Sequence, residues 1–405
     1  MFYSGYQAQA DAIEPLRYLA RAAGHSLGQA APGNGEGYWV RHLAALGQVI
    51  ARAGLTHRRP AFGIDAVAVG GREVVVREHA VHRTPFCTLL HFEKESVAPQ
   101  ARVLLVAPMS GHFATLLRDT VRTMLPDHDV YLTDWHNPRD IPAREGHFGV
   151  GSFIEHLIAF LEVMGPGSHI LAICQPSVAA LAAVAIMAED ENPALPLSMT
   201  LMAGPIDTRI NPTKVNEFAT SKPIDWFERS LISAVPIGFA GAGRKVYPGF
   251  LQLTAFMNMN MDRHVKSFHD LYNHLVKGEH EKAEAVQKFY EEYFAVMDLT
   301  AEFYLETVRA VFQEHDLPRG ALEIRGRRVD TRAIRRTQLL TIEGERDDIC
   351  AIGQTLAAQD LCSGIRPYMK RHYMQTGVGH YGVFSGRRWA TQIYPIVRDV
   401  IQASQ

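Results

Sequence analysis

One cysteine stands where a short apolar segment meets a longer apolar stretch, at residues 172–177, which read Ala-Ile-Cys-Gln-Pro-Ser. A strand that turns sharply into a helix presents a nucleophile at the edge of a sheet, and small flanking residues such as Ala172 suit the tight turn. The helix N-terminus would favour the thiolate of Cys174, because the positive end of the helix dipole stabilises an anion. The competing interpretation is a structural cysteine, since cysteine is among the most frequently buried residues.

An acid and a histidine follow the cysteine, each after a predicted strand. Asp347 lies in Gly-Glu-Arg-Asp-Asp-Ile at 344–349, and His380 ends Gly-Val-Gly-His at 377–380. Nucleophile, acid and histidine occur in this order in α/β-hydrolases. We expect His380 to deprotonate Cys174 and later protonate a leaving alcohol, while Asp347 orients the imidazole. Asp348 is the alternative acid; the position of Asp347 at the turn favours Asp347.

Backbone amides are expected to stabilise the oxyanion of the reaction. One N–H would come from Gln175, the residue after the nucleophile. The other would come from the loop after a strand that ends at Ala107. Because Pro108 has no N–H, Met109 or Ser110 is the expected donor, although an ordinary strand–helix turn explains this loop equally well.

Alternating strands and helices must position these residues. Strands are predicted at 88–92, 102–106, 130–133, 169–173, 198–202, 338–342 and 373–375. Helices are predicted at 113–125, 153–164, 178–189 and 387–402. This alternation predicts an α/β fold with a mostly parallel sheet, helices on both faces, and ligands beyond the carboxyl ends of the strands. A hairpin is expected at 64–78, where Gly70 and Gly71 form the turn.

The alternation is interrupted, which divides the chain into four segments. Residues 1–60 predict an N-terminal helical arm, broken by a Gly/Pro-rich stretch at 31–35. Residues 61–209 and 334–405 predict two parts of one core, and 210–333 predict an inserted helical cap without strand patterning. Residues 225–312, within the cap, hold 15 of the 37 aromatic residues. This enrichment indicates either an apolar binding surface or the helical core of the cap itself.

Composition excludes several classes of protein. The 405 residues carry 41 Lys and Arg against 43 Asp and Glu, which argues against a nucleic-acid footprint. The longest apolar run, 178–188, is too short to span a bilayer, and the N-terminus resembles no secretory signal. Four widely spaced cysteines make no disulfide framework. We therefore expect a cytoplasmic protein; the oligomeric state stays open.

Cofactor and metal sites are not expected. The Gly-rich stretch at 33–37 follows no strand, so it is not a dinucleotide-binding motif. His264, His269 and His274 are spaced by five residues, and this spacing does not place them on one helix face.

The chain resembles the intracellular poly(3-hydroxybutyrate) depolymerases, which are related to the polyhydroxyalkanoate synthases. The motifs that carry the resemblance are Met-Phe-Tyr-Ser-Gly-Tyr-Gln at 1–7, Ile-Cys-Gln-Pro at 173–176, Glu-Gly-Glu-Arg-Asp-Asp-Ile at 343–349 and Gly-His-Tyr-Gly at 379–382. Residues 134–138, Asp-Trp-His-Asn-Pro, are similar to a synthase motif. The resemblance implies an α/β-hydrolase fold and a triad of Cys174, His380 and Asp347.

The resemblance also implies an activity, namely degradation of stored polyester granules inside a bacterial cell. The expected reaction passes through an acyl-thioester, with either water or coenzyme A as the acyl acceptor. The apolar cap would then grip a polyester chain or the granule surface. A synthase-like acyltransferase and a non-catalytic granule-surface protein are the alternative functions.

Overall fold

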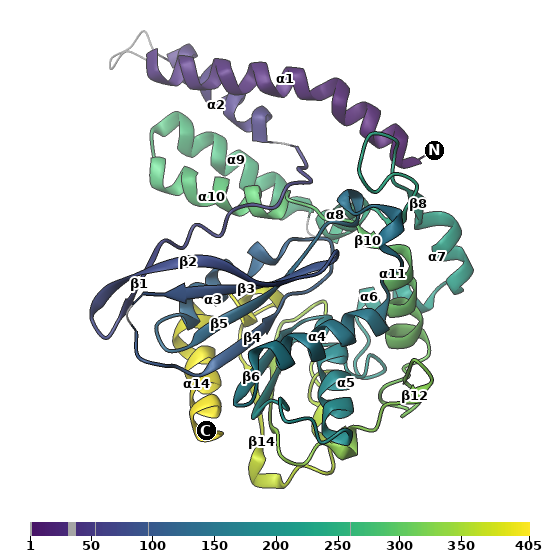
Figure 1. Ribbon diagram of the computed structural model, residues 1–405. Helices are drawn as coiled ribbons and strands as arrows, with labels where there is room; N and C mark the ends of the chain where they lie inside the picture. Colours follow the sequence, from purple (N-terminus) through teal and green to yellow (C-terminus); the bar gives the residue numbers. More distant parts are fainter. Residues whose placement is uncertain (1, 31–37, 53, 96, 260) are drawn as a thin grey trace.

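A computed structural model describes residues 2–30, 38–52, 54–95, 97–259 and 261–405 (Figure 1). Within these residues the central sheet has nine strands in the order β1-β2-β3-β5-β4-β6-β7-β13-β14. The strands are β1 Ala66–Val69, β2 Arg72–Arg83, β3 Cys87–Lys94, β4 Arg102–Val106, β5 Asp129–Trp135, β6 Ser168–Ile173, β7 Ser198–Met202, β13 Gln338–Gly344 and β14 Lys370–Gln375. The sheet confirms each predicted strand of the core.

The sheet combines an antiparallel edge with a parallel centre. Strands β1, β2 and β3 pair antiparallel, and β3 joins β5 antiparallel. From β5 to β14 all neighbours are parallel. Every residue of β6 and β7 is buried, as expected for strands with helices on both faces. This arrangement is an α/β-hydrolase fold, and the carboxyl ends of its parallel strands meet at one edge.

Helices cover both faces of this sheet, as predicted. Helices α4 (Val150–Met164) and α5 (Pro176–Glu189) pack against each other on one face. Helices α3 (Arg118–Met124) and α14 (Tyr394–Ala403) lie on the other face (Figure 1). Eleven residues of α5 are buried, so the helix that follows Cys174 is fixed within the core.

The segment between β7 and β13 is mainly helical. Its helices are α6 Lys214–Thr220, α7 Ile224–Leu231, α8 Gly249–Met259, α9 Met261–Lys277, α10 His280–Tyr293 and α11 Ala301–Thr307, the last followed by a π-helix at Val308–Gln313. Helices α9 and α10 pack against each other as a hairpin.

The expectation of a cap without strands was wrong. The same segment contains β8 (Ser233–Ala234), β9 (Lys245–Tyr247) and β10 (Leu299–Thr300), which form a small sheet, and a β11–β12 hairpin at 323–328. Strands of two or three residues are too short to produce the alternating pattern by which a sequence reveals a strand.

The N-terminal segment forms two helices, α1 (Phe2–Ala30) and α2 (Tyr38–Arg52), as predicted. The predicted break at 31–35 lies outside the described residues. Helix α2 lies between α1 and the α9–α10 hairpin (Figure 1). Among the described residues, no helix is both long enough and apolar enough to cross a bilayer.

The first turn of α1 is anchored on the segment between β7 and β13. The Tyr3 hydroxyl donates a 2.7 Å hydrogen bond to Oδ2 of Asp298, and the Gly249 N–H donates to Oδ1 at 2.9 Å. Tyr3 and Asp298 are both fully buried. Burial raises the pKa of Asp298 to about 6, although hydrogen bonds from Gly249 and Tyr3 oppose the shift. The opening motif of the sequence therefore fixes the start of the helical arm.

Candidate active site

Cys174 occupies a strained turn between β6 and α5. Its φ angle is 66°, in the left-handed region that residues other than glycine rarely adopt. The turn is held by two backbone hydrogen bonds: Cys174 N–H donates to the Met202 carbonyl at 2.8 Å, and Ser177 N–H donates to the Cys174 carbonyl at 3.0 Å. The thiol thus lies at the carboxyl edge of the sheet, beside the N-terminus of a buried helix, as predicted for a nucleophile elbow.

The turn requires small residues around it. Ala172 and Ser177 are fully buried, and a Cβ atom at Gly204 would overlap the Ser177 side chain. Gly204 is fixed in turn by Thr355, whose hydroxyl accepts from the Gly204 N–H at 2.8 Å and donates to its carbonyl at 3.0 Å. Proline is accommodated at position 176 because the first turn of a helix needs no N–H donor there.

Asp347 and His380 form a buried pair. His380 Nδ1 lies 2.8 Å from Oδ2 of Asp347, whose side chain has no exposed surface. The other oxygen, Oδ1, accepts hydrogen bonds from the N–H groups of Ile349 at 2.9 Å and Cys350 at 2.8 Å. Asp348 is exposed, and it lines a cavity that adjoins His380. Of the two candidate acids, it is Asp347 that contacts the imidazole.

The charge on His380 is set by its neighbours. Burial alone would lower the pKa of this imidazole, but the negative charges of Asp347 and Cys174, together with hydrogen bonding to both side chains, raise the pKa well above its usual value. An imidazole held beside a carboxylate and a sulfur keeps its proton more readily than a free imidazole. The three residues separated in sequence are therefore electrostatically coupled.

The loops that carry the acid and the histidine are tied to each other. Arg346 N–H donates to the Val378 carbonyl at 2.8 Å, and Gly377 N–H donates to the Glu345 carboxylate at 2.6 Å. A Cβ atom at Gly344 would lie 3.0 Å from the Val378 carbonyl, so a side chain there would push the two loops apart. The approach of the two loops explains how His380 is brought back over the sheet.

The predicted oxyanion donors lie in the loop after β4 and at the start of α5. Met109 is buried and Ser110 is half-buried. Across the described residues, the N–H groups of Met109, Ser110 and Gln175 donate to no other protein group. Their role stays a prediction, and unpaired amides are what an oxyanion hole requires.

A tryptophan supports the start of the loop after β4. Trp135 is buried at the end of β5, and its indole N–H donates to the Ala107 carbonyl at 2.9 Å. Its neighbour Asp134 is paired with Arg59 at 2.8 Å. Trp135 therefore holds the end of β5 against the start of the loop that carries Met109, while Asp134 ties β5 to the segment that carries Arg59.

A cavity of about 690 Å³ adjoins the histidine. Its inner wall includes His380, Arg346 and Tyr381 from the loops after β13 and β14, and its outer wall comes from α9 and α10. Cys174 is not among its lining residues. The size is within the range of small-molecule sites. Sequence reasoning missed Arg346 and Tyr381, although both are direct sequence neighbours of predicted triad residues.

The aromatic residues of α10 fit both interpretations of the aromatic enrichment, as a helical core and as an apolar binding surface. Tyr290 and Phe294 belong to a buried cluster with Leu253 and Val296, so they build the core of this region. Phe289 is 48% exposed and lines the cavity beside His380. The densest aromatic and methionine run of the sequence, Phe-Met-Asn-Met-Asn-Met at 256–261, lies partly outside the described residues.

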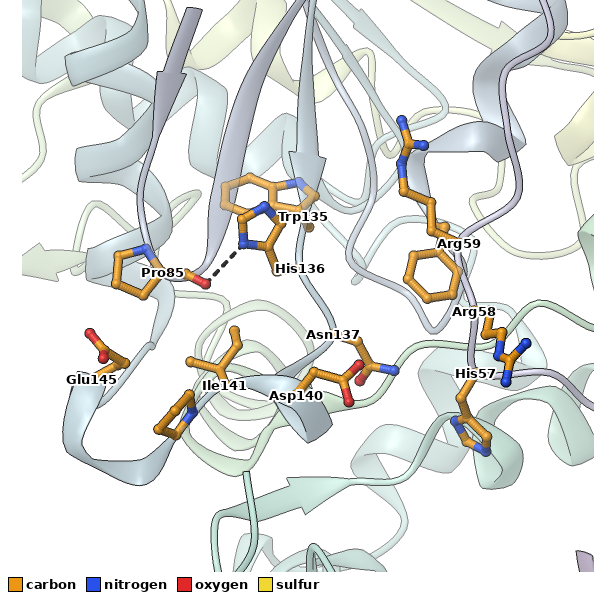
Figure 2. Close-up of a pocket in the computed structure, with 12 residues that line it drawn as sticks. His57, Arg58, Arg59, Pro85, Trp135, His136, Asn137, Asp140, Ile141 and Glu145 are labelled. Carbon is orange, nitrogen blue, oxygen red and sulfur yellow. Dashed lines mark hydrogen bonds between the residues drawn. The ribbon is translucent and has the colours of Figure 1, made fainter. Parts of the chain in front are cut away.

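A second cavity, of about 650 Å³, lies at the end of β5 (Figure 2). His136 projects there and shares a 2.9 Å hydrogen bond with the Pro85 carbonyl. The residues that line it include Arg58, Asp140 and Glu145 but none of the predicted triad. Throughout the described ranges, no group of three or more His, Cys, Asp or Glu residues could hold a metal ion.

Comparisons with solved structures return distant hydrolases. A meta-cleavage product hydrolase from Pseudomonas fluorescens IP01 is 14% identical, with 84% of this chain and 98% of that chain covered and a TM-score of 0.43. A 2-hydroxy-6-oxo-6-phenylhexa-2,4-dienoate hydrolase from Rhodococcus sp. strain RHA1 is also 14% identical, covering 81% and 99% with a TM-score of 0.41. A thermophilic esterase from Thermogutta terrifontis is 12% identical, covering 83% and 98% with a TM-score of 0.40.

Comparisons of sequence are more specific. No curated protein matches this chain. The family model described as PHB de-polymerase C-terminus matches residues 203–405, where PHB denotes poly(3-hydroxybutyrate). The matched segment contains Asp347 and His380, while Cys174 precedes it. Because this segment makes up half of the sequence, the chain belongs to the PHB de-polymerase family.

Proposed function

We propose that this protein is a cytoplasmic depolymerase that cleaves ester bonds of stored poly(3-hydroxybutyrate), with Cys174 as the nucleophile. One observation carries the proposal: a cysteine with a φ of 66° is coupled to a buried histidine that lies 2.8 Å from a buried carboxylate. A structural cysteine needs neither a strained backbone nor a buried Asp–His pair beside it. Membership of the PHB de-polymerase family supports the choice of polymer.

The first half-reaction transfers an acyl group to the enzyme. The Cys174 thiolate attacks an ester carbonyl carbon and forms a tetrahedral intermediate, whose oxyanion accepts hydrogen bonds from Gln175 N–H and from Met109 or Ser110 N–H. When the intermediate collapses, the ester C–O bond breaks and His380 donates its proton to the departing alkoxide. The products are a shortened chain with a free hydroxyl and an acyl-thioester on Cys174.

The second half-reaction releases the acyl group to an acceptor. Water, deprotonated by His380, attacks the thioester carbonyl and gives a carboxylic acid, after which the thiol is restored. Coenzyme A would instead accept the acyl group through its own thiol. This transfer exchanges one thioester for another, so it conserves the energy that hydrolysis releases.

A reducing compartment suits this chemistry, because the nucleophile must remain a free thiol. All four cysteines are free in the structure, and Cys87, Cys350 and Cys362 are buried. Free thiols fit the reducing cytoplasm that we propose, and the proposed association with polymer granules follows from the proposed substrate.

The test is to incubate purified protein with amorphous poly(3-hydroxybutyrate) particles, with and without coenzyme A, and to identify the products by mass. Free hydroxyacids or oligomers indicate hydrolysis, and hydroxyacyl-coenzyme A indicates thiolysis; either result supports the proposal. Polymer growth from added hydroxyacyl-coenzyme A, without degradation, would indicate an acyltransferase and overturn it. Unchanged particle degradation by Cys174→Ala would remove the cysteine from the mechanism.

A further inference from the structure

Small residues allow α1 and α2 to pack closely against each other as a hairpin. A Cβ atom at Gly47 of α2 would lie 2.9 Å from the Ala20 carbonyl of α1. A Cβ atom at Gly24 of α1 would lie 3.2 Å from the Ala44 carbonyl of α2. The two backbones therefore approach closely, and large apolar side chains are not needed between the helices. Such side chains are present in both helices nevertheless, and their location calls for an explanation.

The large apolar side chains of α2 face solvent. Trp39, Leu43, Leu46 and Ile50 are 74%, 56%, 47% and 40% exposed. Their spacing of four, three and four residues places them in one stripe along the helix. A folded protein normally buries such a stripe, and a contiguous exposed one marks an interaction surface.

Helix α1 adds to this surface. Leu16 and Leu19 are 62% and 63% exposed, and the exposed Ala12 and Ala23 lie in the same helical stripe. The stripe contains no charged residue. We call Leu16, Leu19, Trp39, Leu43, Leu46 and Ile50 together the hairpin face.

Other side chains of α2 contact the rest of the molecule through polar groups. His42 Nδ1 lies 2.6 Å from the Tyr272 hydroxyl of α9. On α10, Glu291 lies 3.9 Å from Arg52. These contacts fix α2 on the α9–α10 hairpin and turn the apolar stripe away from it. In Figure 1, α1 and α2 accordingly form the outermost layer above α9 and α10.

We propose that the hairpin face docks the enzyme onto the apolar surface of the solid polyester, an inference that rests on the proposed function. A polyester surface is apolar and carries no formal charge along its chains, and the hairpin face matches it in both respects. An anionic membrane selects helices whose polar face carries basic residues exposed to the lipid headgroups. On α2, the exposed Arg41 lines a groove toward α9 and α10, and Arg52 lies 3.9 Å from Glu291 of α10, so neither belongs to the apolar stripe.

Docking through this face would hold the enzyme at the polymer surface, with α9 and α10 between that surface and the cavity beside His380. Helix α2 rests on α9 and α10, and these two helices supply the outer wall of the cavity beside His380. Phe289 extends the apolar character from α10 into that cavity. The hairpin thus raises the local concentration of ester bonds without taking part in their cleavage.

The test compares two triple variants that replace exposed apolar residues by glutamine. Trp39→Gln, Leu43→Gln and Leu46→Gln remove most of the α2 stripe. Ile237→Gln, Val163→Gln and Tyr368→Gln are the matched control, since these side chains are 98%, 45% and 74% exposed elsewhere. Each triple is measured for co-sedimentation with amorphous polyester particles in a Cys174→Ala background. In the active enzyme, each triple is measured for cleavage of particles and of a soluble hydroxybutyrate trimer.

We expect the hairpin triple to bind particles at least about tenfold more weakly than the control triple. The reason is that the variant no longer buries the apolar surface of three side chains against the particle. Particle degradation should fall similarly, while trimer cleavage should stay within twofold. Particle binding equal to that of the control would overturn the proposal.

Two further outcomes would also overturn docking to polyester. A change from dimer to monomer in the hairpin triple, with unchanged particle binding, would make the face an interface between two copies. Binding of the parent protein to anionic phospholipid vesicles but not to polyester particles would assign the face to a membrane. Failure of the proposed function looks different: the parent would bind particles through the hairpin face and cleave neither particles nor trimer.

Discussion

The carboxyl edge of the sheet and the N-terminal hairpin are built on opposite principles. At the sheet edge, Asp347 has no exposed surface and all its hydrogen-bonding oxygens are used. At the hairpin, Trp39 is 74% exposed. Catalytic groups need fixed geometry, which burial and hydrogen bonds provide, whereas a docking surface must leave its apolar groups available. The contrast predicts that substitutions at the two places fail in different ways.

The largest effect is expected from the nucleophile. Cys174→Ala should reduce ester cleavage by about three orders of magnitude or more, because no thioester can form, while particle binding stays unchanged. Cys362→Ala is the control, since this buried cysteine belongs to the core and should affect stability only. Turnover of the soluble trimer measures the effect. Comparable losses in both variants would contradict the distinction between the two cysteines.

The next effect concerns the two neighbouring acids. Asp347→Asn should lower kcat by about 10²- to 10⁴-fold, because the imidazolium loses its carboxylate partner. It should also lower the pKa of His380, which NMR titration of the imidazole can follow, since the Asp347 charge raises that pKa. Asp348→Asn should leave both quantities nearly unchanged, because Asp348 is exposed. A larger loss at Asp348 would reverse the assignment of the acid.

Glycine substitutions test the difference in packing. Gly204→Ala should destabilise the fold by about 2–4 kcal/mol and reduce activity, because the new Cβ overlaps Ser177 beside the nucleophile. Gly5→Ala in α1 should instead stabilise it by up to about 1 kcal/mol, since nothing lies within 4 Å of the new Cβ. Denaturant unfolding of both variants gives the two free energies. Equal effects would mean that the two regions do not differ in packing.

The last effect depends on pH and concerns the anchor of the hairpin. The pKa of Asp298 is raised to about 6, so the folded state favours the protonated carboxyl. Its contribution to stability is therefore fully present below the usual pKa of 3.8 and is lost as the pH rises from there through about 6, by about 3 kcal/mol at most. Asp298→Asn cannot ionise, so the difference in unfolding free energy between variant and parent should change across this range. A constant difference from pH 4 to pH 7 would contradict the raised pKa.

Sequence patterns predicted the core of the fold well, because its strands are long enough to show apolar runs and its nucleophile turn joins two of the clearest elements. The order of Cys174, Asp347 and His380 likewise follows from the fold. The pattern at 344–349 favoured Asp347 over Asp348, and the structure places only Asp347 against the histidine. Their catalytic roles remain predictions.

Other features depend on tertiary packing that no local pattern records. The strands between β7 and β13 are too short to leave a period, and the cavity beside His380 forms only when α9 and α10 meet the loops of the core. The hairpin was predicted as helical, but its exposed stripe was not. Apolar residues at helical spacing indicate a face that packs against something. Only the fold shows that α1 and α2 contact each other through the small residues Gly24 and Gly47, which leaves the large apolar side chains exposed.

The central claim, that Cys174 carries the acyl group during ester cleavage, can be tested by trapping the intermediate. Enzyme mixed with a soluble hydroxybutyrate trimer is quenched with acid within the first turnovers, and its peptides are analysed by mass spectrometry. We predict a hydroxybutyryl adduct on the peptide that contains Cys174, and its removal by hydroxylamine as expected for a thioester. An adduct on another residue, or turnover by Cys174→Ala at the parent rate, would contradict this account.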